Sequence, residues 1–515
     1  MSSIRLFSAA LMGLDAFPVE VEVDSSPGLH SFSIVGLPDK SVDESKDRIA
    51  SAIKNSGFIA PIKKNKRIIV NLAPADIKKE GSSYDLPIAL GYLLTTSQVN
   101  FEATDAILIG ELSLDGSLKK VNGILPIAVM AKEQGFKRLI LPRENAAEAS
   151  FVSGVDIIGA SNILEVSDYL SGKKVIEPEL RADYESFSRN QEVGDGLDVS
   201  QIRGQESAKR ALIIAAAGAH NILMSGSPGA GKTLLARALA GILPDMNHDE
   251  ALEVTKIYSV SGLVKDQPII IRRPFRNPHH TTSAVAVTGG GTWPKPGEIT
   301  LAHRGVLFLD ELPEFPRNVL EALRQPLEGG QVVVSRAAGS VKFPAKFMLV
   351  AAMNPCPCGN FGDEKLACIC SANSVYKYNK KVSGPLLDRI DIQINISRET
   401  YDKMTGPARG ETGESIRQTV KKAREVQAKR FAGSATLTNS EMGIKEIGKF
   451  CVLTNDAELL LKEAFVSYNL SGRGYHKILK VARTIADLDS VDIIGANHIA
   501  EAIGYKVKPT TEGVA

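Results

Sequence analysis

The 515-residue chain has almost no net charge, only 6% aromatic residues and no long apolar run. Its 61 Lys and Arg residues are balanced by 59 Asp and Glu residues, so any surface for nucleic acid must be local. A helix that spans a bilayer needs about 20 consecutive apolar residues, a length that no segment approaches. Residues 6–14 faintly resemble the core of a signal peptide, but they lead into the alternating segment VEVEVD, which predicts a strand. We therefore expect a cytoplasmic protein that is neither secreted nor embedded in a membrane.

Cysteine is also scarce, and it is unevenly placed. Four of the five cysteines lie within fifteen residues, in the spacing CxC-x9-CxC: Cys356, Cys358, Cys368 and Cys370. A tight cluster in a long chain of this composition indicates a metal site rather than a disulfide framework. Four thiolates suit the tetrahedral preference of Zn²⁺, so we expect a structural zinc. A reduced loop without metal and a redox or iron–sulfur role remain alternatives, and Cys451, alone in an apolar setting, is expected in the core.

The chain is too long for one compact core, and its composition and its pattern of predicted strands and helices change along its length. Residues 1–172 mix β-rich runs with helical stretches, residues 173–199 form a polar linker, and residues 200–398 alternate strands and helices. Residues 399–515 are mostly helical. The clearest predicted elements are strands at 19–23, 67–72, 106–109 and 138–141 and helices at 41–56, 414–431, 454–466, 474–487 and 496–504. The pattern predicts a multidomain α/β protein with an α+β domain, a layered α/β domain and a helical domain.

The segment GSPGAGKT satisfies the phosphate-binding pattern GxxxxGK[ST] in full. It follows an apolar segment, 221–225, and precedes a good helix former, 234–242, which is the strand–loop–helix context that the motif needs. Its glycines let backbone N–H groups turn toward phosphates, and the helix N-terminus adds partial positive charge. We expect ATP here, with Lys232 on the β- and γ-phosphates and Thr233 on Mg²⁺. The predicted nucleotide-binding residues are Gly226, Ser227, Pro228, Gly229, Ala230, Gly231, Lys232 and Thr233.

A second motif, VLFLDE, ends in Asp310 and Glu311. Four apolar residues followed by two acids are typical of a buried parallel strand that presents carboxylates at its C-terminal edge. We expect Asp310 to hold Mg²⁺ through water and Glu311 to polarise the attacking water. Such a run is common on its own. Its place in the same α/β region as the phosphate loop makes this interpretation strong.

Three further polar residues that could take part in the site lie after VLFLDE in the chain. Asn354 ends the next apolar segment, where its amide could bind the attacking water or the γ-phosphate or could simply cap a turn. Arg389 lies in GPLLDRID and Arg473 in SGRG, and each taken alone is more typical of a surface arginine than of a catalytic one. His279, His280 and His303 lie before VLFLDE, where we expect hydrogen bonding rather than a second metal site.

The order GSPGAGKT, VLFLDE, NP, GPLLDRID, SGRG resembles an AAA+ ATPase of the magnesium-chelatase-like branch. The segments RGQESAKRAL, PFRNPHHTTS, GGGTWPKPGEITLAHRG and NPCPCGNFG, with GLPDKSVDESKDRI and NLAPADIKKEGSSYDLPIAL near the N-terminus, make the resemblance specific to the ComM (YifB-type) family. It extends over nearly the whole chain. The resemblance implies Asn354 as sensor 1, Arg389 as an arginine finger acting on the neighbouring subunit, and Arg473 as sensor 2 closing a C-terminal helical lid over the phosphates. A finger supplied to a neighbour implies a ring, usually a hexamer.

The N-terminal region resembles the proteolytic domain of Lon proteases, through KKEGSSYDLPIAL and GELSLDGSLKKVNGILPIAVMAKEQGF. Ser83 falls where those enzymes have their nucleophile, but Leu125 falls where they have the lysine base. A leucine cannot take a proton from serine, and Lys119 and Lys120 lie several residues away. We therefore expect a catalytically inactive Lon-like domain, used for assembly or nucleic acid.

The family resemblance implies an ATP-driven hexameric DNA motor, a branch-migration helicase for homologous recombination during natural transformation, with recombination proteins as candidate partners. Arg336, in the predicted hairpin QVVVSRAAGSVKF, is a candidate for DNA contact in a central pore. Basic clusters, each more often a solvated face than a DNA site, are Lys63, Lys64, Lys66, Arg67, Lys78, Lys79, Lys421, Lys422, Arg424, Lys429 and Arg430. The alternatives are a chelatase-type motor that remodels a protein partner and, disfavoured by Leu125, an ATP-dependent protease.

Overall fold

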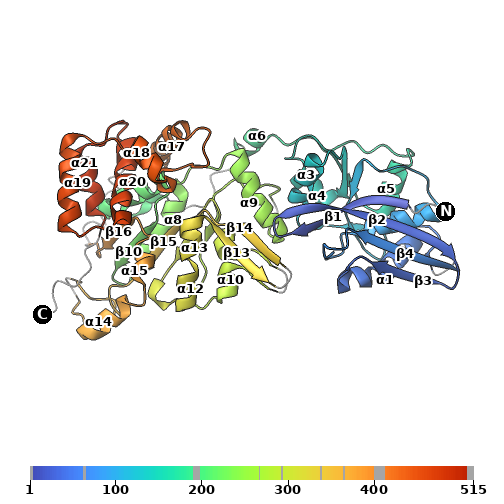
Figure 1. Ribbon diagram of the computed structural model, residues 1–515, viewed down its shortest axis with the longest axis horizontal. Helices are drawn as coiled ribbons and strands as arrows, with labels where there is room; N and C mark the ends of the chain where they lie inside the picture. The colour runs from blue at the N-terminus through green and yellow to red at the C-terminus, as the bar shows by residue number, and fades with distance from the viewer. Residues whose placement is uncertain are drawn as a thin grey trace. The chain divides into compact units, whose positions relative to one another are not determined.

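The computed structural model describes residues 4–61, 65–189, 198–265, 267–291, 294–336, 339–363, 366–399 and 412–506. None of the helices in these ranges combines the length and the apolar character that crossing a bilayer requires. The chain divides into two compact units (Figure 1). The first unit contains Met1–Gln191 and Asn247–Ile271, and the second contains Glu192–Met246 and Arg272–Ala515.

The first unit is built on a seven-stranded mixed sheet in the order β3-β4-β2-β1-β5-β8-β9. β2 pairs antiparallel with both β1 and β4, and the remaining pairs in the sheet are parallel. The strands are β1 (Ile4–Met12), β2 (Asp15–Pro27), β3 (Ser31–Val35), β4 (Lys66–Ala73), β5 (Ala106–Leu108), β8 (Arg138–Pro142) and β9 (Asp156–Ala160), with a separate ribbon of β6 (Glu111–Leu112) and β7 (Leu118–Lys119).

Alternating hydrophobicity creates the buried face of this sheet. In β2, Val19, Val21 and Val23 are fully buried, while the glutamates between them are partly exposed. The helices of the unit's N-terminal segment are α1 (Lys40–Asn55), α2 (Asp85–Thr95), α3 (Ile124–Glu133), α4 (Arg143–Ala149), α5 (Ile163–Leu170) and α6 (Tyr184–Arg189). The predicted strands and the predicted helix at 41–56 are confirmed, and β2 extends beyond its predicted ends.

The first unit also contains a buried ion pair, formed by Arg48 and Asp85. Arg48 donates two hydrogen bonds to Asp85, from Nε at 2.9 Å and from a terminal nitrogen at 3.1 Å, and the Asp85 side chain is only 1% exposed. Burial raises the pKa of Asp85 to about 6, although the bonds from Arg48 act in the opposite direction. Asp85 also accepts the backbone N–H of Leu112, so the pair ties α1 and α2 to the β6–β7 ribbon.

Helix α9 (His248–Val260) belongs to the first unit although it follows α8 (Lys232–Ile242) of the second unit in the chain. Ala251, Val254 and Ile257 are fully buried along one side of α9. Backbone and side-chain bonds hold the segment beside α3: Gly123 donates its N–H to the Ser259 carbonyl at 3.1 Å. No sequence pattern had indicated that this segment would join the N-terminal region.

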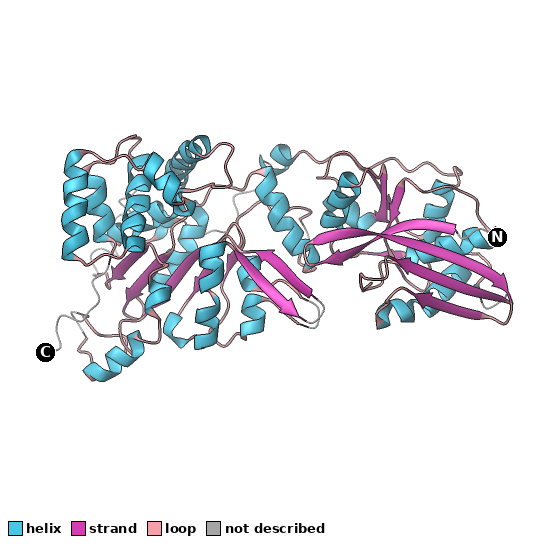
Figure 2. Ribbon diagram, viewed as in Figure 1, coloured by secondary structure: helices cyan, strands magenta, loops and turns pink. Residues whose placement is uncertain are grey.

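The second unit contains a five-stranded parallel sheet in the order β11-β12-β15-β10-β16. Its strands are β10 (Ile222–Gly226), β11 (Phe275–Arg276), β12 (Val306–Leu309), β15 (Met348–Met353) and β16 (Ile392–Ile396). Every residue of β12 and β15 is buried, as expected for parallel strands covered on both faces. The helices of this part, drawn in cyan in Figure 2, include α7 (Glu206–Gly218), α8, α10 (Ala284–Thr288), α11 (Glu298–Leu301), α12 (Arg317–Ala322), α13 (Arg324–Gly329), α14 (Ala372–Asn379) and α15 (Gly384–Leu387). Among them, α7 packs against β16, and α8 packs against β10 and β15.

The C-terminal part of the second unit is helical, as predicted. Helices α17 to α21 lie together, in orange to red in Figure 1, and α20 packs against α7, α17, α18 and α21. Their bounds are α17 (Gly413–Arg430), α18 (Ile444–Phe450), α19 (Asn455–Ser467), α20 (Gly472–Leu488) and α21 (Ala496–Gly504). The four helices predicted in this region are confirmed to within two residues at each end.

The predicted hairpin before the sensor strand is also present. β13 (Gln331–Arg336) pairs antiparallel with β14 (Gly339–Pro344), and Arg336 stands opposite Gly339 at the tip. The side chain of Arg336 lies outside the described residues, so its predicted DNA contact stays a prediction.

Candidate nucleotide-binding site

The predicted phosphate loop lies between the end of β10 and the start of α8. Gly229 and Gly231 have φ angles of 78° and 88°, values that favour glycine over every other residue. Gly231 is the N-cap of α8, so the loop leads directly into the helix N-terminus. That terminus offers backbone N–H groups and partial positive charge, the two features that bind phosphate.

The side chain of Lys232 folds back and bonds to the phosphate loop itself. Its ammonium donates to the carbonyls of Gly226 at 2.6 Å and Ser227 at 3.0 Å and to Asn354 Oδ1 at 3.0 Å. Burial lowers the pKa of Lys232, and the charges of two nearby carboxylates act in the opposite direction. Asn354 directly follows β15, the strand beside β10, so the parallel sheet brings these motifs together across 122 residues of sequence.

Asp310 directly follows β12, the neighbour of β15, and lies at the same edge of the sheet. Its Oδ2 accepts a hydrogen bond from Thr233 Oγ1 at 2.8 Å. Hydroxyl and carboxylate oxygens are the donors that Mg²⁺ prefers, so this pair fits the predicted metal. Mg²⁺ bound here would be held by Thr233 and Asp310 and would neutralise charge on the phosphates.

Glu311 follows Asp310 with a φ of 52°, and its side chain is 54% exposed. Its Oε2 lies 3.2 Å from Nδ1 of His280, and the His280 ring contacts that of His279 with centroids 4.1 Å apart and planes tilted by 33°. His279 bonds to the Thr281 hydroxyl at 2.9 Å. Sequence reasoning expected hydrogen bonding from these histidines but missed the partner of His280. The only available signal was the polar run NPHH directly after the short strand β11.

Arg389 and Arg473 meet at one carboxylate. A terminal nitrogen of each arginine lies 2.6 Å from Glu328 Oε1, although the two arginines are far apart in sequence. The hydrogen bond from Arg389 is the main reason that the pKa of Glu328 lies below its ordinary value. Sequence reasoning gave no role to Glu328, which lies in α13 at the end of LRQPLE, a segment that contributes only to the family resemblance.

The pair of arginines lies at the opposite edge of the sheet from the phosphate loop. The Arg389 carbonyl accepts from Asn221 Nδ2 at 3.0 Å, and Asn221 immediately precedes β10. The phosphate loop follows the other end of β10, and a five-residue strand spans roughly 16 Å at about 3.3 Å per residue. The structure thus brings Lys232, Thr233, Asp310 and Asn354 together and groups Arg473 with Arg389 instead.

Asp391 fixes the amino edge of the sheet. It accepts the backbone N–H of Asn221 at 3.2 Å and lies 3.6 Å from Lys477 of α20 and 3.5 Å from His220. Burial opposes ionisation, but hydrogen bonding to His220 and the charge of Lys477 lower the pKa of Asp391 to about 2. The carboxylate therefore joins the sheet to the C-terminal helices.

The four clustered cysteines form a second candidate site, next to the phosphate loop. Their Sγ atoms lie within 4.8 Å of one another, and Cys356, Cys358 and Cys368 are separated by 3.4, 3.6 and 3.7 Å. Tetrahedral zinc with Zn–S bonds of about 2.3 Å places sulfurs roughly 3.8 Å apart, so the cluster fits this metal. Backbone N–H groups, foremost that of Asn360, lower the pKa of the Cys358 thiol to about 6, whereas burial and the bonds with neighbouring cysteines raise the pKa values of Cys368 and Cys370.

Comparisons with known proteins agree with this geometry. The family "Magnesium chelatase, subunit ChlI" matches residues 198–404, "Subunit ChlI of Mg-chelatase" matches 21–145, and "Magnesium chelatase, subunit ChlI C-terminal" matches 410–506. The Competence protein ComM of Haemophilus influenzae is 44% identical over 512 residues, 98% of each chain. The chain belongs to the ComM family.

Other relatives support the same assignment. The YifB protein of Escherichia coli is 41% identical to this ComM-family chain over 510 residues, 98% of this chain and 97% of its own. The magnesium-chelatase 38 kDa subunit of Rhodobacter capsulatus is 24% identical over 320 residues, 58% of this chain. The ComM family is magnesium-chelatase-like and AAA+, which implies ATPase activity with ATP and Mg²⁺.

The basic clusters of this ComM-family chain differ in their availability to DNA. Lys79 is fully buried and donates to the Pro74 carbonyl, Arg424 donates to the Ala216 carbonyl at 2.7 Å, and Arg430 pairs with buried Asp487. These three residues are structural, which corrects their place among the candidates. Exposed members are Arg67, Lys421, Lys422 and Lys429, whereas Lys63 and Lys64 lie outside the described residues.

The Lon-like positions lie in the first unit of this ComM-family chain. Leu125 is buried in α3, and its backbone N–H donates to Glu148 Oε1 at 3.2 Å. Burial raises the pKa of Glu148, which also accepts from the Ser259 hydroxyl. Lys120 donates to the Val264 carbonyl at 2.8 Å, so its ammonium is held by the α9 segment.

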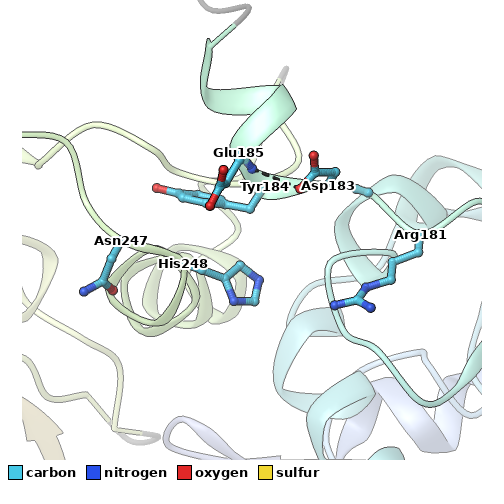
Figure 3. Close-up of a pocket in the computed structure, with 7 residues that line it drawn as sticks. Arg181, Asp183, Tyr184, Glu185, Asn247 and His248 are labelled. Carbon is cyan, nitrogen blue, oxygen red and sulfur yellow. Dashed lines mark hydrogen bonds between the residues drawn. The ribbon is translucent and has the colours of Figure 1, made fainter.

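A hollow of about 520 Å³ also lies in the first unit (Figure 3). It is lined by residues 181–185 and by Asn247 and His248, and the ring of Tyr184 packs edge-on against His248 with centroids 5.4 Å apart. Asp183 caps α6, and Asn247 caps α9. The polar groups of this hollow thus serve local structure. α6 itself was not predicted within the linker of residues 173–199.

Proposed function

We propose that this chain is a ring-forming ATPase that drives branch migration of DNA during homologous recombination in natural transformation. The observation that carries the ATPase part is the meeting of Lys232, Asp310 and Asn354 at the carboxyl edge of one parallel sheet. The DNA part rests on the relative named Competence protein ComM, because competence is the uptake of DNA, and on 98% coverage of both chains.

Each residue of this edge has a distinct role in hydrolysis. Lys232 binds the β- and γ-phosphates, and Thr233 and Asp310 hold Mg²⁺. Glu311 orients and polarises the attacking water, and Asn354 binds that water or the γ-phosphate as sensor 1. His280 positions Glu311 through the 3.2 Å contact between their side chains.

Arg389 and Arg473 act together on the nucleotide of a neighbouring subunit. Arg389 is separated from its own phosphate loop by the length of β10, and Glu328 holds Arg473 beside it. Placing both guanidinium groups against the neighbour's phosphates would stabilise transition-state charge, an effect worth about 10³ to 10⁵ in rate. Sites completed by a neighbour require a closed ring, usually of six subunits in this family.

DNA is held through phosphate contacts from a few basic residues in each subunit. Arg336 at the tip of the β13–β14 hairpin and the exposed Lys421 and Lys422 of α17 are the candidates. Releasing counterions at Z contacts gives a log–log salt slope of roughly −0.7Z to −0.9Z, so binding should weaken steeply with salt.

A chelatase-type motor that remodels a protein partner is the second candidate. The three family matches, which are all to a magnesium-chelatase subunit and together reach from residue 21 to 506, favour it. This candidate requires the same ATPase edge and the same ring, and it differs only in the substrate of the motor.

The deciding experiment incubates purified full-length protein with Mg·ATP and a labelled four-way DNA junction. Wild type should convert the junction to duplex products, and the ATPase rate should rise with DNA of any base sequence. Glu311→Gln is the matched control, because it should bind nucleotide and assemble without hydrolysing ATP. If ATP is hydrolysed but DNA changes neither rate nor junction at any salt concentration, the DNA proposal is wrong and the chelatase-type motor takes its place.

A further inference from the structure

The cysteine loop, residues 356–363 and 366–370, touches the phosphate loop through a side chain. Asp363 Oδ2 accepts a hydrogen bond from the Ser227 hydroxyl at 2.7 Å. Both partners are shielded from water, since Ser227 is 7% exposed and the Asp363 side chain is 6% exposed. A hydrogen bond to a shielded carboxylate is a strong one, so it fixes the position of Ser227 relative to the cysteine loop.

A second group reaches both loops at once. Arg398, just beyond β16, lies 3.5 Å from Asp363 Oδ2 through its Nε, and a terminal nitrogen of the same side chain donates to the Pro228 carbonyl at 3.2 Å. Pro228 has no N–H of its own to hold it in place. The carbonyl of Pro228 is therefore oriented by Arg398, and Arg398 by the cysteine loop.

The third contact is between the backbone of Gly359 in the cysteine loop and the ring of Pro228 in the phosphate loop. A Cβ atom placed on Gly359 would lie 2.4 Å from Cδ and 2.6 Å from Cγ of Pro228, so only glycine lets the two loops approach. Gly359 directly follows Cys358, and its N–H donates to the Cys356 carbonyl at 3.0 Å. The surface that supports Pro228 is thus built from the same turn that carries two of the cysteines.

Nothing within the described part of the cysteine loop forms a helix or a strand. Its shape depends on local turns and on what joins the sulfurs, because a metal bound to such a loop contributes its binding free energy to the folding of the loop. From these contacts we infer that the cysteine loop positions Ser227 and Pro228 and thereby couples metal binding at the four cysteines to nucleotide binding at the phosphate loop. Asp363 is the main positioning residue of this coupling.

Metal binding at the cysteines and nucleotide binding at the phosphate loop should each strengthen the other. With metal bound, the loop holds Ser227 and Pro228 in one arrangement, and the nucleotide does not have to order them. Linkage is reciprocal, so nucleotide must tighten zinc binding by the same factor by which zinc tightens nucleotide binding. Typical couplings of this kind are about 5-fold to 150-fold in affinity. This inference rests on the proposed function, because it requires that the phosphate loop binds nucleotide.

Two glycines of the loop offer a matched pair of variants. Gly359 and Gly362 have φ angles of 83° and 76°, so alanine strains the backbone at both. Only at Gly359 does the new Cβ meet Pro228, whereas nothing lies within 4 Å at Gly362. Gly359→Ala should weaken the binding of a fluorescent ADP analogue by about tenfold, and Gly362→Ala should leave the Kd within about twofold of wild type.

Zinc content must be measured in both variants by elemental analysis. This measurement distinguishes an effect of the altered contact with Pro228 from an effect of losing the metal. If Gly359→Ala loses its zinc or fails to fold, Asp363→Ala replaces it, since Asp363 is five residues from the nearest cysteine on either side. Asp363→Ala should weaken ADP binding in the same way while keeping zinc. Equal ADP affinities in Gly359→Ala, Asp363→Ala and wild type, at equal zinc content, would overturn the inference.

A measurement without nucleotide distinguishes this inference from the proposed function. Amide hydrogen exchange of the peptide covering residues 223–235 should quicken at least about fivefold when a chelator removes zinc from the full-length protein. If wild type binds no ADP, the proposed function fails whatever the exchange shows. If ADP binds but neither its Kd nor the exchange of this peptide responds to zinc, the coupling alone is wrong.

Discussion

The two units place their polar side chains in different ways. In the second unit all five strands of the sheet are parallel, and three adjacent strands end in the phosphate loop, Asp310 and Asn354. In the first unit antiparallel pairs run through the sheet, and its buried charged groups, such as Asp85 with Arg48, bind partners inside the same unit. Parallel strands bring their carboxyl ends to one edge, so the second unit can gather a reactive site from residues distant in sequence. The first unit uses buried charge for its own fold.

The largest expected effect is the loss of ATP hydrolysis in Lys232→Ala. Lys232 bonds to the phosphate loop and to Asn354, so its removal takes away both a phosphate contact and the link between two strand ends. ATP turnover should be abolished in a steady-state assay. Turnover near the wild-type rate would mean that this edge of the sheet is not the catalytic site.

Next in size are Arg389→Ala and Arg473→Ala, which should each lower turnover by about 10³ while nucleotide binding is kept. Because both arginines lie away from their own phosphate loop, we expect their loss to affect a neighbour's site. Mixing either variant with Lys232→Ala should restore part of the activity, at interfaces that pair an intact phosphate loop with intact arginines. No recovery at any mixing ratio would contradict action across subunits.

One buried carboxylate in each unit should make the stability of the two units depend on pH in opposite directions. The pKa of Asp391 is about 2, below its value of about 4 in an unfolded chain, so the ionised form stabilises the second unit by about 2–3 kcal/mol. This contribution is present above pH 4 and is lost as pH falls from about 4 to 2. Asp391→Asn should remove it at neutral pH, as measured by hydrogen exchange of a peptide covering residues 384–396.

In the first unit the pKa of Asp85 is raised to about 6, so the folded form takes up a proton that the unfolded chain does not bind until about pH 4. Stability of the first unit should therefore rise as pH falls from about 6 to 4. Hydrogen exchange of a peptide covering residues 85–95, corrected for the intrinsic rate, measures this change. The same sign of pH dependence in both units would contradict the contrast between the two carboxylates.

A smaller effect is expected for His280→Ala. Without the 3.2 Å contact, Glu311 is free to leave its position, and kcat should fall by about tenfold with unchanged nucleotide affinity. His279→Ala is the matched control, because His279 contacts His280 but bonds to Thr281 rather than to Glu311. Equal losses in the two variants would show that the pair acts only through structure.

No effect is expected for Ser83→Ala. The predicted Lon-like arrangement has Leu125 at the position of the lysine base, so we expect that Ser83 is not activated. ATP turnover should be unchanged, and a labelled protein substrate should remain uncut by wild type and variant alike. Cleavage by wild type that Ser83→Ala abolishes would overturn the view that this domain is inactive.

Much of the candidate nucleotide-binding site could be predicted because its motifs are short and contiguous. GSPGAGKT and VLFLDE each carry their own strand and loop signals, and the parallel arrangement then requires that they meet. The contacts that could not be predicted join residues without a local pattern. Ser227 and Asp363 are 136 residues apart, His280 and Glu311 come from different loops, and nothing in LRQPLE indicates that Glu328 binds two arginines. Such pairings depend on side-chain packing, which a single sequence does not reveal.

The inclusion of α9 in the first unit has a consequence for engineering this protein. The chain passes from one unit to the other three times, after residues 191, 246 and 271. Deleting the first 191 residues would therefore not yield a clean ATPase fragment, because α9 packs against α3 and its Leu252 would lose the apolar core that it packs against. A chimaera that exchanges the N-terminal region between two relatives must carry residues 247–271 with it. Evolution of the two segments is subject to the same constraint, since a substitution in α3 must keep its packing against α9, a helix encoded between two segments of the second unit.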